Sequence, residues 1–439
     1  MTYAEYKVFG IEGYKPANKH TLWYLKPVAA TTAGDRWMEY SLPIGNGQLG
    51  ASIFAGIYKD EIQFNEKTLW SGRNTDKSAE YGDYENFGSV FVESLEEDNF
   101  GFGEARAVKD YYRQLDLSNA TASASFKSSD KSVTYTREYI TSYPDNCIAA
   151  KYTADAKGKI NLRFTLKSGR PGIKAETSYS DGYAMFNGSL ETISYAARLK
   201  VVPTGGTMTT DSEGIVVKGA DEVLLILVGA TDFDAYSATY TSNTSSLVGN
   251  VKNRVDNAAA KDWGTIYSAH VLDYQTYNDR VEFELTGSEN NMPTDELIKQ
   301  YARRSTGYED YALMLEQLYF HYGRYLEICS SRGVDLPSNL QGIWNNSLFA
   351  PWDSKYTINI NAEMNYWPAE TTNLSEMHMP FLNYIHNMAI NHTEWQGYAK
   401  ASGQTKGWTC YTENNIFGGV GSFMHNYVIA NAWYCTHLW

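Results

Sequence analysis

Residues 222–229 read EVLLILVG, a short apolar run with a charged residue only at its start. Two similar segments precede it, INLRFTLK at residues 160–167 and ARLKVV at residues 197–202. Turn-forming sequences separate such runs: Pro-Asp-Asn at Pro144, Ser-Asp-Gly at Ser180, Asn-Gly at Asn187 and Gly-Gly at Gly205. Short runs of Val, Ile, Tyr, Phe and Thr with this punctuation are typical of antiparallel strands. The sequence therefore predicts a large antiparallel sandwich over about residues 22–232.

Helical periodicity replaces the strand pattern in the second half of the chain. Residues 236–247 are rich in Ser, Thr and Ala and suit a connector. Residues 257–279 are predicted to be helical, and residues 280–285 to form one more strand. From Pro293 onward apolar residues recur at helical spacing, as in Leu315, Leu318, Tyr319, Tyr322, Leu326 and Cys329. A further helix is expected to begin near 379–380, with Pro380 in its first turn.

These patterns divide the chain into three parts and give an α+β multidomain class. They are a β-sandwich at residues 1–234, a linker with a helix at 235–292, and a helical domain at 293–439. The last residues, YVIANAWYCTHLW at 427–439, are strongly apolar and contain no glycine. A helix this apolar needs neighbours on several sides, so we expect the chain to end inside a domain and the natural protein to be longer.

Composition excludes several classes of protein. The 439 residues carry a net charge of −14, which disfavours nucleic-acid binding and polybasic attachment to a membrane surface. No window approaches 18 apolar residues, so no transmembrane helix is expected. The start of the chain shows no secretory signal, and both a secreted and a cytoplasmic location stay open. The four cysteines, Cys147, Cys329, Cys410 and Cys435, lack zinc-site spacing. Composition does not indicate an oligomeric state.

Polar and aromatic residues are densest at 336–376, LPSNLQGIWNNSLFAPWDSKYTININAEMNYWPAETTNLSE. If residues 357–361 are extended, Thr357, Asn359 and Asn361 project from one side. Two carboxamides aimed at one point can hold a water through their carbonyl oxygens. An amide is no base at neutral pH, so a carboxylate must lie nearby. Alternatively, the asparagines satisfy backbone groups of a loop.

The same stretch resembles the catalytic domain of glycoside hydrolase family 95, the inverting α-L-fucosidases. RWMEYSLPIGNGQLGASIFAGIYKDEIQFNEKTLWSG at 36–72 is similar to the opening signature of that family. Shorter segments agree in consistent order: GDYENFGSVFVE at Gly82, SVTYTREYITSYPDN at Ser132 and PTDELI at Pro293. The resemblance implies a β-super-sandwich, a helical linker and an (α/α)6 barrel, of which residues 293–439 form only the first part.

The resemblance also implies roles for residues. Asn359 and Asn361 match the family's asparagines that help to activate the attacking water. The family's general-acid glutamate and supporting aspartate lie further downstream, beyond Trp439, so we expect this chain to be poorly active. The carboxylates near the motif to test first, should it prove active, are Asp353, Glu363 and Glu413. The implied partners are terminal α-L-fucosyl groups of glycans.

Thr357 departs from the better-studied fucosidases, which carry histidine at this position. Threonine occurs in other members of the family, including some that favour α-L-galactosides. L-Fucose is 6-deoxy-L-galactose, and a shorter threonine leaves room for the extra hydroxyl and offers it a hydrogen bond. L-Galactosylated glycans are therefore a second expected substrate.

Other residues have two interpretations. Trp344 and Trp352 stack on sugar or pack the mouth of the barrel, and Asn65 reaches the substrate or stabilises the sandwich. His321, His378, His386 and His392 lack metal-site spacing. PIGNGQLG has the spacing of a dinucleotide loop, but a strand pattern follows it, so we predict a β-turn and no cofactor. A non-catalytic carbohydrate-binding protein and, less well supported, a lyase remain alternatives.

Overall fold

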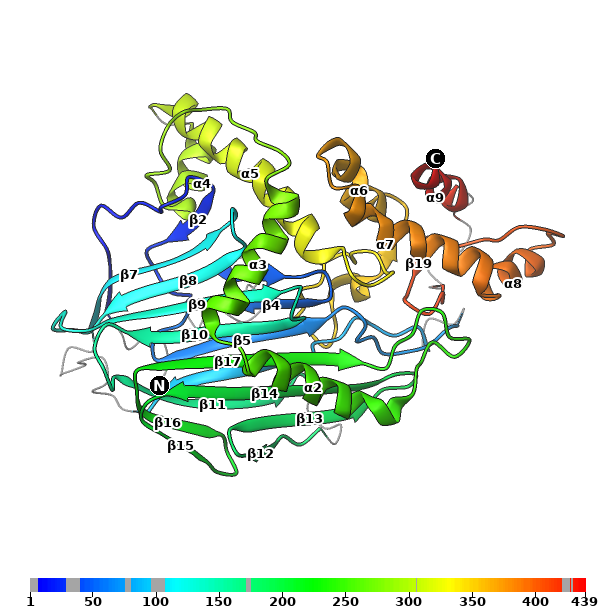
Figure 1. The fold of residues 1–439 in the computed structure, drawn as a ribbon. Helices are drawn as coiled ribbons and strands as arrows, with labels where there is room; N and C mark the ends of the chain where they lie inside the picture. Colours follow the sequence, from blue (N-terminus) through cyan, green and yellow to red (C-terminus); the bar gives the residue numbers. More distant parts are fainter. Residues whose placement is uncertain are drawn as a thin grey trace.

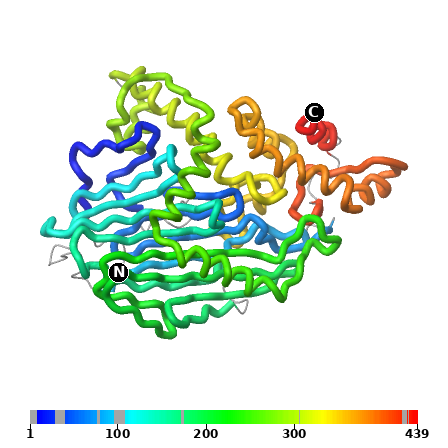
Figure 2. The backbone as a smooth tube through the Cα atoms, viewed as in Figure 1, coloured from blue at the N-terminus to red at the C-terminus, as the bar shows by residue number. Residues whose placement is uncertain are grey.

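The computed structural model describes residues 7–28, 40–75, 80–95, 107–170, 175–304, 306–420, 427 and 429–439. Two β-sheets pack face to face in the N-terminal half, and helices make up most of the rest (Figure 1). The course of the backbone shows the two halves side by side, with the C-terminus in the helical half (Figure 2).

The larger sheet has ten strands, in the order β1-β7-β8-β9-β10-β17-β14-β13-β12 with β2 also paired to β7. These strands are β1 (Lys7–Gly10), β2 (Thr21–Tyr24), β7 (Ala107–Asp116), β8 (Thr121–Lys127), β9 (Thr134–Ser142), β10 (Cys147–Ala154), β12 (Ser178–Ser180), β13 (Tyr183–Ser189), β14 (Ser194–Thr204) and β17 (Glu222–Thr231). Their pairings are antiparallel except that β1 runs parallel to β7.

The smaller sheet has seven strands, in the order β15-β16-β11-β6-β5-β4-β3. They are β3 (Leu42–Gly45), β4 (Leu49–Ile53), β5 (Lys59–Glu66), β6 (Gly88–Ser94), β11 (Ile160–Ser168), β15 (Thr207–Thr210) and β16 (Ile215–Ala220). The three strands predicted from apolar runs lie within β11, β14 and β17, so those predictions are confirmed.

Strand β17 is apolar throughout because both of its faces are covered. Leu225 and Leu227 belong to the core between the two sheets. Leu224, Ile226 and Val228 belong to a second core on the outer face of the larger sheet. Since successive side chains of a strand point to opposite faces, a strand buried on both sides loses its alternation.

The second core is formed by the linker helices α2 (Leu247–Ala259) and α3 (Trp263–Asn278), which lie across the larger sheet (Figure 1). The single helix predicted over 257–279 is therefore wrong in its bounds. The carboxylate of Asp262 accepts a hydrogen bond from the Thr265 N–H at 2.9 Å and caps α3, which ends one helix and begins the next.

The predicted turn in PIGNGQLG is confirmed. Gly45 ends β3, Gly50 lies in β4, and Gly47 between them has a φ of 90°. The Gly47 N–H donates to the Cys329 carbonyl at 2.7 Å. A Cβ at Gly47 would lie 2.3 Å from Arg332, so these glycines let the hairpin contact the helical half closely.

The strand predicted at 280–285 is wrong. Residues 281–284 pair with no strand in the described part of the chain and run along α5 (Tyr308–Ser330). Side chains of α5 satisfy their backbone: His321 Nε2 lies 2.9 Å from the Phe283 carbonyl, and Gln317 Oε1 accepts from the Leu285 N–H at 2.8 Å. An extended, alternating segment can therefore bind a helix in place of a sheet.

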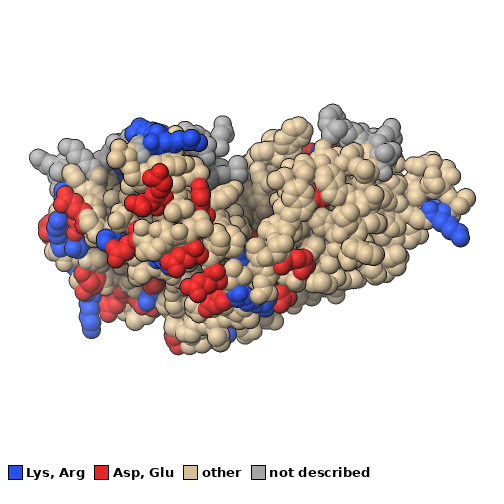
Figure 3. Space-filling model, turned by 90° about the horizontal axis from the view of Figure 1, so that it is seen from above, with Lys and Arg blue, Asp and Glu red and all other residues tan. Residues whose placement is uncertain are grey.

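The remaining helices of the described chain complete the second half. They are α4 (Thr294–Arg303), α6 (Asn361–Thr371), α7 (Ser375–His386), the π-helical η6 (Asn387–Asn391), α8 (Glu394–Ala401) and α9 (Ala430–Leu438). Helix α7 begins at Ser375, so the predicted start at Pro380 is wrong and this proline lies inside the helix. Seen from above, the half with α6 to α9 carries few charged side chains (Figure 3). Among the helices described, none is long and apolar enough to cross a membrane.

Candidate functional site

A pocket of about 370 Å³ opens beside the N-terminus of α6. Thr357, Asn359 and Asn361 all line it, and Trp352 and Glu413 complete much of its wall. The three polar residues singled out from the sequence therefore share one pocket.

A turn, and not a continuous strand, brings the two asparagines to this pocket. Strand β18 (Tyr356–Thr357) pairs with β19 (Glu413–Asn414), so that Thr357 lies opposite Glu413. The extended backbone ends there, because residues 358–360 form a turn and Asn361 is the first residue of α6. The expectation that 357–361 is extended is wrong, although its consequence, a shared pocket, is observed.

The two carboxamides are not used by the protein itself. Within the described part of the chain, neither the Asn359 nor the Asn361 side chain has a hydrogen-bond partner, and the hydroxyl oxygen of Thr357 is buried without one. The alternative in which these amides satisfy loop backbone groups therefore has no hydrogen bond to support it. Three free polar groups facing one pocket are suited to holding a water or a hydroxylated ligand.

A lysine separates two carboxylates beside the pocket. Lys355 Nζ lies 2.5 Å from Asp353 and 3.2 Å from Glu413. Burial alone would lower the pKa of Lys355, but the bond to Asp353 and the charge of Glu413 outweigh it and raise this pKa. The ammonium group therefore stays charged, and it neutralises carboxylates that would otherwise repel each other.

Asp83, from the sandwich, is a further member of this charged group. Burial, together with the bond and the negative charge of Asp353, raises the pKa of Asp83 to about 7. Two neighbouring carboxyls that share a proton in this way are a known source of such shifts. In the sequence, only the position of Asp83 in the GDYENFGSVFVE segment points to it.

The loop that carries Trp352 has an unusual backbone. Trp352, Asp353 and Ser354 in η5 (Pro351–Ser354) have φ values of 56°, 57° and 51°. Left-handed conformations are unfavourable for residues with a side chain, and such strain is found preferentially at functional sites. The Tyr84 N–H donates to the Asp353 carbonyl at 3.1 Å and helps to hold the turn. The indole of Trp352 is 70% exposed at the pocket, as a sugar-stacking side chain would be.

Trp344 and Asn65 occupy different positions from Trp352. Trp344 is buried, its Nε1 donates to the Ile44 carbonyl at 3.0 Å, and it lines a separate cleft. Asn65 is fully buried in β5, where its Oδ1 accepts from the Asn345 N–H at 2.9 Å and its Nδ2 donates to the Asn345 carbonyl at 2.8 Å. This amide thus pairs with the backbone of the site loop and joins it to the sandwich.

Replacing Asn65 with alanine is expected to lower the free energy of unfolding by about 1–3 kcal/mol, because the Asn345 N–H would be left buried without a partner. Chemical denaturation measures this loss. The control is Asn253→Ala, on the exposed face of α2, which should leave stability unchanged. Unchanged stability in Asn65→Ala, with weakened sugar binding, would instead support the predicted contact with substrate.

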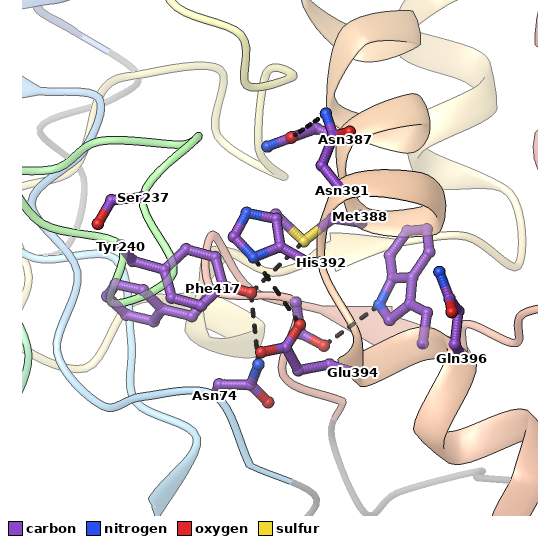
Figure 4. Close-up of polar contacts among 12 residues, drawn as sticks. Asn74, Ser237, Tyr240, Asn387, Met388, Asn391, His392, Glu394, Gln396 and Phe417 are labelled. Carbon is purple, nitrogen blue, oxygen red and sulfur yellow. Dashed lines mark hydrogen bonds and ion pairs between the residues drawn. The ribbon is translucent and has the colours of Figure 1, made fainter.

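A second polar cluster joins the linker to the helical half (Figure 4). His392 stacks on Tyr240 with ring centroids 4.4 Å apart, and its Nε2 lies 2.7 Å from the Ala235 carbonyl. Asn387 Nδ2 donates to the same carbonyl at 2.6 Å. Asn74, from the sandwich half, donates to the Tyr240 hydroxyl at 3.4 Å. This histidine therefore has a packing role, and no group of His, Cys, Asp or Glu in the described ranges is arranged to hold a metal ion.

Glu363 is a buried acid close to the site. It lies in the first turn of α6, has no exposed surface, and neither of its carboxylate oxygens has a hydrogen-bond partner among the described residues. Burial raises the pKa of Glu363 to about 7. Its position two residues after Asn361 was the only sequence signal for it.

Two family models match different parts of the chain. The glycosyl hydrolase family 95 catalytic domain matches residues 262–439, and the glycosyl hydrolase family 65 N-terminal domain matches residues 22–83 and 73–236. "Alpha-L-fucosidase 2" of Arabidopsis thaliana is 27% identical over 94% of this chain and 55% of its own length. "Probable alpha-fucosidase A" of Aspergillus niger is 29% identical over 91% of this chain and 55% of its own length. The chain thus spans about half the length of the curated relatives it matches.

A solved structure supports the fold. A candidate kojibiose phosphorylase from the human microbiome superposes with a TM-score of 0.59 over 93% of this chain and 53% of its own, at 9% sequence identity. The predicted class, an antiparallel β-super-sandwich followed by a helical linker and helices of the (α/α)6 type, is confirmed. At this identity the likeness concerns the fold alone.

Proposed function

We propose that this chain, which belongs to glycoside hydrolase family 95 through residues 262–439, is part of an exo-acting glycosidase that removes terminal α-L-fucosyl groups from glycans with inversion. The substrate is proposed from the names of its curated relatives, which are α-fucosidases.

The observation that carries this proposal is the convergence of Asn359 and Asn361, both without internal hydrogen bonds, on one pocket. In an inverting hydrolase a water attacks the anomeric carbon from the face opposite the leaving group. Two amide oxygens accept hydrogen bonds from that water and orient it, and Trp352 offers an aromatic surface for the sugar ring.

We further propose that the general acid comes from polypeptide outside these 439 residues. Lys355 engages the carboxylates of Asp353 and Glu413. Glu363 is unpaired but has no exposed surface and is not among the residues that line the pocket. Inverting enzymes need an acid and a base about 6.5–9.5 Å apart on opposite faces of the sugar. Loss of general-acid assistance lowers the rate on the order of 10²–10⁴-fold.

The test compares the 439-residue chain with the complete protein encoded by its reading frame. Both are assayed with p-nitrophenyl α-L-fucoside and with a fucosylated oligosaccharide, and the anomer of the product is followed by NMR. We expect the complete protein to release β-L-fucose first and the 439-residue chain to be far slower. Release of the α-anomer would contradict inversion, and equal rates would contradict the external acid.

Thr357 favours a second substrate, the α-L-galactosides. Its hydroxyl oxygen faces no partner among the described residues and lies in the wall of the pocket. The C6 hydroxyl that distinguishes L-galactose from L-fucose would give this group a hydrogen bond.

In the complete protein, Thr357→His is expected to raise the ratio of kcat/KM for fucoside over L-galactoside by on the order of tenfold, because a single small group in a pocket discriminates by about 1–3 kcal/mol. The matched control is Thr357→Val, which keeps the shape but removes the hydroxyl and should weaken only L-galactoside hydrolysis. Ratios that do not change in either variant would show that Thr357 does not select the sugar.

A further inference from the structure

A second cleft, of about 630 Å³, lies between the sandwich and the helical half. One wall is α5, the floor includes β3 and β4, and the other wall comes from the loop at 338–344 and from α6. The face seen in Figure 3 is hollowed between its two halves, between the regions of α5 and α6. Leu340 lines both this cleft and the pocket of the asparagines, so one loop separates the two spaces.

Three side chains of this cleft each have a buried polar atom without a hydrogen-bond partner in the described structure. They are the hydroxyl of Ser52, Oε1 of Glu327 and Oε1 of Gln341. Ser52 has no exposed surface and Glu327 is 7% exposed. Unsatisfied buried polar groups are rare in folded proteins and destabilise them, so their concentration around one cleft indicates a ligand that supplies the missing hydrogen bonds.

Aromatic side chains form the apolar part of the wall. Tyr322 and Trp344 both line the cleft. Because the Trp344 Nε1 is already bonded to the Ile44 carbonyl, the indole is fixed and offers only its carbon surface. Rigid aromatic surface combined with a few oriented polar groups is typical of small-molecule sites, and it suits the mixed apolar and hydroxylated faces of a sugar.

The charge of the cleft favours a neutral ligand. Among the described residues that line it, Glu327 is the only charged one. Lys67, whose charge acts on Glu327, is also buried, and its Nζ donates to the Ser330 carbonyl at 2.9 Å. Burial raises the pKa of Glu327 against the opposing charge of Lys67, so its carboxyl group holds a proton more readily than an exposed glutamate does. Such a carboxyl both donates and accepts hydrogen bonds.

We propose that this cleft is a second saccharide-binding site, which takes a neutral sugar unit through Ser52, Glu327 and Gln341 and is separate from the pocket of Asn359 and Asn361. The site stands apart from the proposed hydrolysis, since it shares none of the residues assigned to that reaction.

Gly323 provides a way to block the cleft without disturbing the fold. It lies in α5, lines the cleft, and a Cβ built on it meets no atom within 4 Å. Gly323→Leu therefore fills the cleft, and it replaces a poor helix former with a good one. Gly249→Leu is the matched control, because Gly249 also lies in a helix, α2, with nothing within 4 Å of its Cβ, but on the outer side of the sandwich.

Binding is measured on the 439-residue chain by saturation-transfer NMR titration with L-fucose, D-galactose, D-glucose and lactose, and with D-galacturonate as an anionic probe. At least one neutral sugar other than L-fucose, which the pocket of Asn359 and Asn361 is itself proposed to bind, should bind. Gly323→Leu should weaken this binding at least tenfold, whereas Gly249→Leu and the double variant Asn359→Ala, Asn361→Ala should not. Gln341→Leu, which keeps the size of the side chain but removes the acceptor, should weaken binding if Gly323→Leu fails to fold.

Several results would overturn the proposal. They are the absence of binding by every neutral sugar, binding that survives both Gly323→Leu and Gln341→Leu, and binding that is lost only in the asparagine double variant. Tighter binding of D-galacturonate than of D-galactose would contradict the neutral class of ligand.

Discussion

In the complete protein, replacing Asn359 with alanine is expected to lower kcat on the order of 10²-fold and to leave the free energy of unfolding unchanged. Stability should not change because the Asn359 carboxamide has no hydrogen-bond partner among the described residues. The rate should fall because an amide that orients the attacking water acts mainly in the transition state. An interaction of that kind affects kcat and kcat/KM equally.

Two further variants sharpen this measurement. Asn359→Asp keeps an oxygen acceptor in the same place, so it should retain more activity than Asn359→Ala if the amide oxygen holds the water. Asn250→Ala, on the exposed face of α2, is the matched control and should keep full activity. A kcat of Asn359→Ala equal to that of the parent protein, with only KM raised, would show that this side chain binds sugar without orienting water.

The fold was predictable where burial is decided locally. Strand β11 was recognised because Leu162, Phe164 and Leu166 face the core in alternation with more exposed residues. The strand predicted at 280–285 is wrong for a related reason. Apolar and polar residues alternate in that segment as they do in β11, although the segment does not join a sheet. Its backbone partners are side chains of α5, which lie more than thirty positions away, and no local pattern contains that information.

The sequence singled out residues that share a pocket, but it did not predict the geometry that brings them together. Asn359 and Asn361 were recognised from their spacing and family resemblance, yet a turn and a helix start bring them together. The charged group could not be assembled from sequence, because Lys355 meets Glu413 through a pairing between segments 58 positions apart. Asp83 reaches it from the sandwich, through a long-range contact that depends on the packing of the two halves.

Replacing Glu363 with glutamine is expected to raise the free energy of unfolding by about 3 kcal/mol near pH 8 and to leave it unchanged near pH 4.5. Glu363 has no exposed surface, and its carboxylate oxygens have no partner in the described chain. A charge in such a place is unfavourable, and burial accordingly raises its pKa from 4.5 to about 7.

The direction of the pH dependence follows from these two values. Below pH 4.5 the carboxyl is neutral in the folded and in the unfolded chain, so the folded state incurs no penalty. As the pH rises towards 7, the unfolded chain loses its proton first and is thereby favoured. The stability that this group contributes is therefore fully present at low pH and is lost as the pH rises from 4.5 through the folded-state pKa of about 7. Glutamine does not ionise, so the variant does not lose this stability as the pH rises.

Denaturant titrations at several pH values between 4.5 and about 8 measure the difference in the free energy of unfolding between Glu363→Gln and the parent protein. Another residue of α6 provides a control for which the expected change in stability has the opposite sign. Glu370 is exposed, and hydrogen bonds from Ser375 and His378 lower its pKa, so Glu370→Gln should reduce stability at high pH. Both variants remove one negative charge from α6, so an effect of net charge alone would move them in the same direction. Parallel pH profiles for Glu363→Gln and the parent protein would mean that the Glu363 carboxylate is solvated or paired, because only an isolated buried acid makes stability depend on pH in this way.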